Sequence, residues 1–299
     1  MEAGLISLAI IYWRDSTDYL SIKNMNEPSE TIYKDYPKSY VAVLDILGFK
    51  DIVRAGSHED LKLVYQRFCE AIKHGLSNGK YVCSDDGKTK SIGPDIQQAT
   101  VNSLLVSDSI WVWTDDNSVE SFGNIVRAVR NLLSFSILKR ILLRGAISIG
   151  PLTMVKNQWP SQTYSFQYSL FGKAIVDAVE AEKMQEWCGC VITEAAIECY
   201  KKDCFAGKSL IEKKVILFYP VPIKDKEIDS YVIDWVNHPE CGIEVKTIKK
   251  AFEHAIAPQK LPASDDWEKI KRKLANTLEF VKSIKNKESR GFVPWCSRP

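Results

Sequence analysis

Two aspartates stand at the ends of apolar runs that have the length of buried strands. Asp45 follows the run Tyr40-Val-Ala-Val-Leu, and Asp108 stands between the runs 101–106 and 109–113. Because an uncompensated carboxylate is costly to bury, two acidic side chains on adjacent strands usually share a divalent cation. Oxygen-only ligands suit Mg²⁺ or Mn²⁺. The pair therefore predicts a site for two such ions, with the carbonyl of Ile46 as a further ligand.

Two metal ions over a triphosphate would support attack by a hydroxyl group. One ion lowers the pKa of the attacking 3′-hydroxyl, and the other neutralises the departing pyrophosphate. The residues Gly48, Phe49 and Lys50 follow Asp45 as a short helical turn whose free backbone N–H groups can cradle phosphate. Lys50 either adds a charge to the phosphates or is a solvated lysine. Asp45 alone would also fit a capping or turn aspartate, and the pairing with Asp108 favours the metal site.

The elements that must position these residues alternate along the chain. A strand over 40–47 leads to a helix that begins with the capping box Ser57-His-Glu-Asp60, then to strands over 101–106 and 109–113, a helix over 119–133 and a strand over 141–150. The order β-α-β-β-α-β is the split βαβ, ferredoxin-like arrangement. We expect an α+β fold, an antiparallel sheet with helices on one face.

In the rest of the chain, after residue 150, the sequence pattern predicts fewer strands and more helix than in the first half. Residues 151–172 form a loop with Pro151 and Pro160, a helix covers 173–186, and short strands lie near 190–193 and 214–219. The tail from about 226 is predicted to be helical, with a helix over 267–284 behind a Ser264 cap. We divide the chain into an N-terminal extension (1–38), a catalytic domain (39–225) and a helical C-terminal extension (226–299).

Composition excludes several classes of protein. The 299 residues are 45% apolar, and 40 Lys and Arg against 38 Asp and Glu leave a charge of +2, too balanced for an electrostatic nucleic-acid binder. Eight cysteines at irregular spacings favour reduced thiols and a cytoplasmic location. The apolar run Leu5 to Trp13 is about half the roughly 20 residues that span a bilayer, so no membrane segment is predicted.

Four motifs, in order and spacing, resemble those of class III nucleotidyl cyclases. The strings are Val43-Leu-Asp45-Ile-Leu-Gly48-Phe49, Ser107-Asp108-Ser109, Arg144-Gly-Ala-Ile-Ser-Ile-Gly150 and Gly172-Lys-Ala-Ile-Val-Asp-Ala, which span about 39–195. The resemblance implies a ferredoxin-like cyclase core that works as a homodimer. It also implies two metals on Asp45 and Asp108, the Ile46 carbonyl as a ligand, and phosphate contacts at Gly48 and Phe49.

The sequence departs from these cyclases at three places. Val176 and Glu180 stand where the family has an Asn and a transition-state Arg on the helix after Gly172. Arg144 then replaces the missing cation or is a strand arginine in a salt bridge, and Lys173 and Lys183 are weaker candidates. The two residues that select a purine in the family are also absent, because residues 101–104 lack the adenine-reading lysine and Ser169 stands where the family has an Asp.

Among class III cyclases, the chain looks most like the bacterial pyrimidine cyclases of anti-phage (Pycsar) systems, which share its short Leu-Asp-x-Leu-Gly motif, Ser-Asp-Ser and Arg-Gly-Ala-Ile. That resemblance implies a cytoplasmic homodimer that makes cyclic UMP or cyclic CMP from UTP or CTP upon phage infection. The messenger then acts through a separate effector protein. Two alternatives stay open: a catalytically inactive nucleotide-sensing module, and a diguanylate-cyclase or palm-type nucleotidyltransferase.

Overall fold

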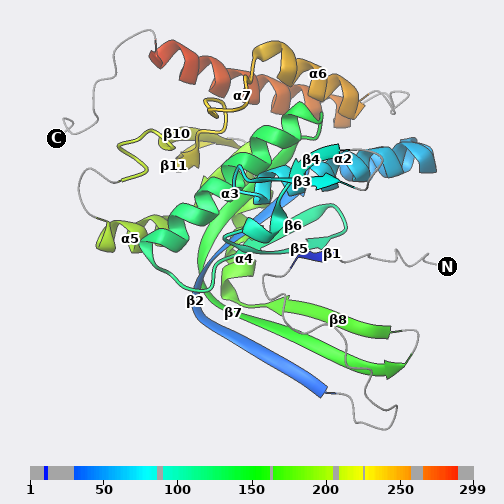
Figure 1. The fold of residues 1–299 in the computed structure, drawn as a ribbon. Helices are drawn as coiled ribbons and strands as arrows, with labels where there is room; N and C mark the ends of the chain where they lie inside the picture. The colour runs from blue at the N-terminus through cyan, green and yellow to red at the C-terminus, as the bar shows by residue number, and fades with distance from the viewer. Residues whose placement is uncertain are drawn as a thin grey trace.

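A mixed sheet forms the centre of the computed structural model, which describes residues 10–12, 30–85, 90–161, 164–204, 209–224, 226–256 and 265–288 (Figure 1). Within these ranges the sheet has nine strands in the order β1-β5-β6-β2-β7-β9-β11-β10, and β8 pairs with β7. The strands are β1 (Ile10–Tyr12), β2 (Glu30–Ile46), β5 (Asn102–Val106), β6 (Ser109–Trp113), β7 (Leu143–Ser161), β8 (Tyr164–Phe171), β9 (Gly189–Ile192), β10 (Ile216–Ile223) and β11 (Lys226–Ile233).

The predicted split βαβ arrangement is confirmed in the middle of this sheet. The neighbours β5-β6-β2-β7 are antiparallel throughout, and helices join β2 to β5 and β6 to β7. One pairing differs from an antiparallel sheet, because β7 and β9 run parallel. The fold is therefore α+β, with a ferredoxin-like core extended on the β7 side.

Helices cover both faces of the sheet, so the expectation of helices on one face is wrong. The helices are α1 (Phe49–Ala55), α2 (His58–Leu76), α3 (Val119–Leu138), α4 (Lys173–Met184), α5 (Glu194–Asp203), α6 (Val245–Ile256) and α7 (Asp265–Glu288), with a 3-10 turn over Ile96–Gln98. Successive residues of a strand point to opposite faces. Ala42 shares a core with α2 and α3, whereas Val41 belongs to a second cluster with Ala174 and Ile175 of α4.

Local signals explain where the core helices begin. The predicted capping box is present: the Ser57 hydroxyl accepts the Asp60 backbone N–H, and the Asp60 carboxylate accepts the Ser57 backbone N–H at 3.0 Å. Ser118 caps α3 in the same way, through the Ser121 backbone N–H. Such caps satisfy backbone donors that have no partner inside the helix. Helix α2 follows α1 at the end of β2, and α3 follows β6.

Three segments differ from the sequence prediction. Residues 151–161 and 164–171 form the ends of a long β7–β8 hairpin rather than a loop, and with the first half of β2 they extend below the body in Figure 1. The segment before the predicted strand over 101–106, where no element is predicted, contains a second hairpin, β3 (Tyr81–Asp85) with β4 (Lys90–Pro94). Helix α5 was not predicted.

The tail is not helical from its start, because residues 226–233 form β11 in the sheet. Its partner β10 carries Pro220 and Pro222 and lies at the end of the strand order. Proline lacks a backbone N–H and is tolerated in edge strands. The division at residues 225 and 226 thus falls within the β10–β11 hairpin.

Helix α7 packs on the sheet domain through its aromatic residue Phe280, which is 0% exposed. The ring meets Trp187, Tyr219 and Trp235 with centroids 4.7 to 5.9 Å apart. The predicted helix over 267–284 is present, and Ser264 lies outside the described residues. In the part of the chain described here, no helix has the length and apolar content to cross a bilayer.

Candidate active site

Asp45 and Asp108 come together at one end of the central strands. Asp45 is the second-last residue of β2, and Asp108 is in the two-residue turn that joins β5 to β6. Ser107, the first residue of that turn, has a φ of +56°, which matches a type II′ hairpin turn. The Ile46 N–H donates to the Asp108 carbonyl at 3.0 Å. The turn is thereby joined to the end of β2 beside Asp45.

The charge of Asp45 is only partly compensated within the protein. Burial, and then the negative charge of Asp108, raise the pKa of the Asp45 carboxyl to about 6. The Ser109 hydroxyl donates to Asp45 Oδ1 at 2.9 Å and partly offsets that rise. Two carboxylates that repel each other in a partly buried site are the arrangement that a divalent cation stabilises.

The donor set fits hard cations whose coordination is completed from outside the protein. Asp45, Asp108 and the Ile46 carbonyl supply only oxygen, as Mg²⁺ and Mn²⁺ prefer. Among the described residues there is no group of three or more His, Cys, Asp or Glu side chains that could hold a metal. Magnesium commonly binds one or two carboxylates together with water and substrate phosphates. Two carboxylates whose remaining ligands come from water and a substrate phosphate therefore fit such a site.

The backbone turn after Asp45 is open on its outer side. Gly48 has a φ of +79°, which disfavours other residues, and a Cβ added there would meet nothing within 4 Å. The Phe49 side chain packs against the main core, whereas Lys50 is exposed at the start of α1. The space beside Gly48 leaves its backbone accessible, and Lys50 extends into solvent.

Arg144 lies directly opposite Asp45, on β7, but its charge is used elsewhere. Its Nε donates to Glu182 Oε1 at 2.5 Å and its Nη1 to the Gln185 carbonyl at 2.8 Å. The two side chains of the ion pair are 14% and 5% exposed. Glu182 therefore neutralises Arg144 within this chain. Sequence reasoning missed Glu182, because a glutamate on a predicted helix carries no signal that it points inward.

The exposed face of α4 lacks an arginine, as the sequence indicates. Val176 is 54% exposed and Glu180 is exposed beside it along the helix. Lys173, a weaker candidate cation, pairs with Asp177 at 2.5 Å. Neither position on this face offers a guanidinium to a substrate.

Comparisons with known proteins give low-identity likenesses. No family model and no curated protein matches the chain. The catalytic core of a rhodopsin-guanylyl cyclase with converted specificity, in complex with ATPalphaS, has 13% identity and a TM-score of 0.43 over 67% of this chain and 97% of that one. The adenylyl cyclase CyaB from P. aeruginosa has 16% sequence identity and a TM-score of 0.42, and the match covers 68% of this chain and 95% of that one. The guanylate cyclase domain of a Catenaria anguillulae protein, in complex with GTP, has 14% sequence identity and a TM-score of 0.41, and the match covers 67% of this chain and 97% of that one. Values this low support no conclusion about activity.

Proposed function

We propose that this protein is a class III-type nucleotide cyclase that converts a pyrimidine nucleoside triphosphate, UTP or CTP, into its 3′,5′-cyclic monophosphate and pyrophosphate. The observation that carries the proposal is the pairing of Asp45 with Asp108. The charge of Asp108 raises the Asp45 pKa, and the Ile46 N–H joins the two segments. Both residues stand in the motifs that resemble class III cyclases.

The chain's own residues then have distinct tasks. Asp45, Asp108 and the Ile46 carbonyl would hold Mn²⁺ or Mg²⁺, two ions per site. When bound, such ions lower the pKa of the 3′-hydroxyl and neutralise the triphosphate. Ser109 fixes the Asp45 carboxylate through its 2.9 Å hydrogen bond. The backbone around Gly48 and Phe49 faces the phosphates, and Lys50 adds a positive charge. The 3′-oxygen attacks the α-phosphorus and pyrophosphate leaves, so one P–O bond forms as another breaks.

The choice of a pyrimidine is supported by residues that purine cyclases need and that this chain lacks. Ser103, in the stretch where an adenine-reading lysine would stand, is 3% exposed, and Ser169 on β8 replaces an Asp. UTP is favoured over CTP because uridylate cyclases are the commoner kind in the group that the sequence resembles. The same resemblance supports a cytoplasmic role in anti-phage defence through a separate effector.

A homodimer is part of the proposal, because class III cyclases build their site between two subunits. Phe171, Val176 and Met184 lie at or on α4 and are 55%, 54% and 48% exposed. Exposed apolar side chains that adjoin one another commonly mark a protein interface, and we propose that these three contribute to one. A second subunit over this face could also supply the cation that α4 lacks.

The test is incubation of the purified protein with ATP, GTP, CTP and UTP separately in Mn²⁺, with products identified by mass spectrometry. We expect cyclic UMP or cyclic CMP, and its loss in Asp45→Asn and in Asp108→Asn. Asp229→Asn, an exposed aspartate on β11, is the matched control and should retain activity. Full activity in both site variants would contradict the metal assignment, and a product that joins two nucleotides would identify a nucleotidyltransferase instead.

A second candidate is a nucleotide-sensing module without turnover. The ion pair between Arg144 and Glu182 favours it, because that pair leaves Arg144 neutralised within its own subunit. A sensing module would bind UTP in the presence of Mn²⁺ and give no product from any of the four nucleotides. Binding without turnover in a protein shown to be dimeric would select this candidate over the cyclase.

A further inference from the structure

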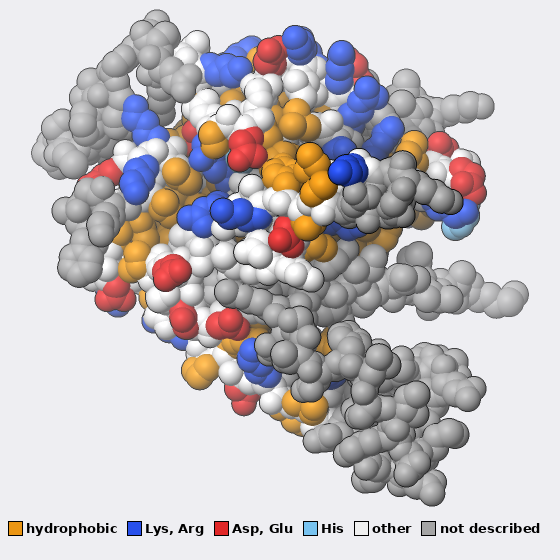
Figure 2. Space-filling model, viewed as in Figure 1, with side chains coloured by type: hydrophobic (Ala, Val, Ile, Leu, Met, Phe, Trp, Pro, Cys, Tyr) orange, Lys and Arg blue, Asp and Glu red, His pale blue; other side chains and the backbone are white. Residues whose placement is uncertain are grey.

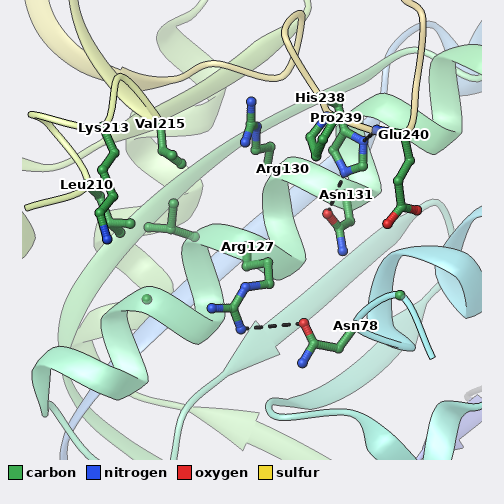
Figure 3. A pocket seen from close by; sticks show the side chains of 13 residues that line it. Asn78, Arg127, Arg130, Asn131, Leu210, Lys213, Val215, His238, Pro239 and Glu240 are labelled. Carbon is green, nitrogen blue, oxygen red and sulfur yellow. Dashed lines mark hydrogen bonds between the residues drawn. The ribbon is translucent and has the colours of Figure 1, made fainter. Parts of the chain in front are cut away.

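A pocket of about 350 Å³ lies along one side of α3 (Figure 3). Its wall combines α3 with the end of the α2 region, the segment after α5 and the loop that follows β11. None of the residues that line it belongs to the candidate active site. They are Asn78, Gly79, Gly123, Val126, Arg127, Arg130, Asn131, Leu210, Lys213, Val215, His238, Pro239 and Glu240.

The pocket has an excess of positive charge. Arg127, Arg130 and Lys213 line it, against the single carboxylate of Glu240. Across the described ranges of the chain, no carboxylate forms an ion pair with any of the three cations; Arg127 donates to the amide oxygens of Asn78 and Asn124 at 3.4 and 3.2 Å. Figure 2 shows Lys and Arg side chains beside hydrophobic ones on the face where α3 reaches the surface.

Arg130 is the best fixed of the three cations. Its Nε donates to the Asp234 carbonyl at 2.6 Å and its Nη2 to the Asn237 carbonyl at 2.5 Å. The Asp234 carboxylate attracts Arg130 electrostatically but forms no ion pair with it among the described residues, and it accepts the backbone N–H groups of Val236 and Asn237. Carbonyl groups orient a guanidinium without cancelling its charge. A partly buried cation of this kind is stabilised further by an anion.

The remaining wall is largely uncharged. His238 is 8% exposed, and its ring bonds Asn131 Oδ1 at 2.8 Å and accepts the Glu240 backbone N–H at 3.2 Å. Burial, and then the charge of Arg130, lower the His238 pKa to about 4, so the ring is neutral at pH 7. Apolar side chains complete the wall: Val126, Leu210, Val215 and Pro239. Cationic groups beside an apolar wall suit a ligand with a charged end and a ring.

We propose that this pocket binds a small molecule that carries a phosphate group on an apolar or aromatic ring. The phosphate would lie between Arg127, Arg130 and Lys213, as arginine and lysine commonly bind phosphate oxygens. The ring would lie against Val126, Leu210 and Val215. The volume is within the range of small-molecule sites, about 300 to 1,000 Å³. The proposal does not depend on the cyclase activity, since it uses none of the same residues.

The test is titration of the full chain with phenyl phosphate, inorganic phosphate and phenol in EDTA, by isothermal calorimetry. Phenyl phosphate should bind most tightly and phenol not measurably. The double variant Arg127→Glu with Lys213→Glu should weaken phenyl phosphate binding at least tenfold. Both side chains are exposed, so the variant should fold. Lys250→Glu, an exposed lysine of α6, is the matched charge reversal and should bind normally.

A second variant separates this pocket from the candidate active site. Asp45→Asn with Asp108→Asn should bind phenyl phosphate as the unchanged protein does. Three results would overturn the proposal: no binding of phenyl phosphate, binding unaffected by the Arg127 and Lys213 reversals, or binding changed by the aspartate variants. A fourth result would also overturn it: the protein binds a DNA oligonucleotide but not phenyl phosphate, and the Arg127 and Lys213 reversals abolish the DNA binding. That outcome would make this surface a nucleic-acid site.

Discussion

Arg144 faces Asp45 across the β2–β7 pair, yet its guanidinium donates to Glu182 of α4. The ion pair is largely buried, so removing one member leaves an unpaired charge, at a cost of about 3 to 5 kcal/mol. This pairing complicates a catalytic role for Arg144, because loss of activity in a single variant would also follow from loss of structure.

A double variant separates the two roles of Arg144. Replacing a buried ion pair by apolar residues of similar volume is often neutral or stabilising. Because we propose Arg144 as the replacement for the missing transition-state cation, we expect Arg144→Met with Glu182→Leu to lower activity at least about 100-fold, the typical loss on removal of a charge-stabilising group. The variant should still unfold near the temperature of the unchanged protein. Product formation measures the first and circular dichroism the second. A folded variant with full activity would show that Arg144 serves structure alone.

The ionised Asp45 carboxylate should lower the free energy of unfolding when no metal is bound. Its folded-state pKa of about 6 lies above the ordinary 3.8, so stability is lost as pH rises through this window and the loss is complete above about pH 6. Asp45→Asn should therefore stabilise the metal-free protein at pH 7.5 by about 1 kcal/mol, after allowance for partial exposure. Thermal unfolding at pH 7.5 and pH 4 measures the difference, which should nearly vanish at pH 4.

Mn²⁺ should make the unchanged protein more stable than Asp45→Asn. A cation that binds only the folded state raises its stability in proportion to the logarithm of its concentration over the dissociation constant. We expect Mn²⁺ with the triphosphate to raise the melting temperature of the unchanged protein, and to have little effect on Asp45→Asn. An equal rise in both proteins would place the metal elsewhere.

His238 should make stability depend on pH in the opposite direction. Its folded-state pKa of about 4 lies below the ordinary 6.5, so the unfolded chain binds protons more readily and stability falls as pH drops from about 6.5 to about 4. The loss should be about 3 kcal/mol, because each pKa unit corresponds to about 1.4 kcal/mol. Urea unfolding across this range should show a flatter profile for His238→Gln than for His58→Gln, an exposed control at the start of α2. Identical slopes in the two variants would contradict this assignment.

Phe280 should show that α7 belongs to the folded unit. Its ring is fully buried against three aromatic side chains, and truncation of such a residue costs about 3 to 5 kcal/mol. Phe280→Ala should therefore lower the single unfolding transition by well over 5 °C. Phe218→Ala, at an edge-strand position 43% exposed, should change it little. A separate early transition, with the main one unmoved, would instead make α7 an independent extension.

Much of the core could be read from local sequence patterns. The apolar run before Asp45 and the two runs around Asp108 have strand length, and a two-residue connection forces those two strands into a hairpin. The capping box at Ser57 is likewise formed by residues three apart. These features depend on neighbours along the chain, so the sequence by itself determined the split βαβ core and the two candidate metal ligands.

Tertiary contacts decided the features that depend on distant residues. Strand β11 has exposed polar side chains and became a strand because β9 and β10 offer hydrogen-bond partners on both sides. Glu182 lies 38 residues from Arg144, and Arg130 lies 104 residues from the Asp234 carbonyl that holds it. Charge and periodicity indicate that such side chains exist, but which cation is neutralised and which is left for a ligand is decided only when the packed elements bring particular atoms within hydrogen-bonding distance.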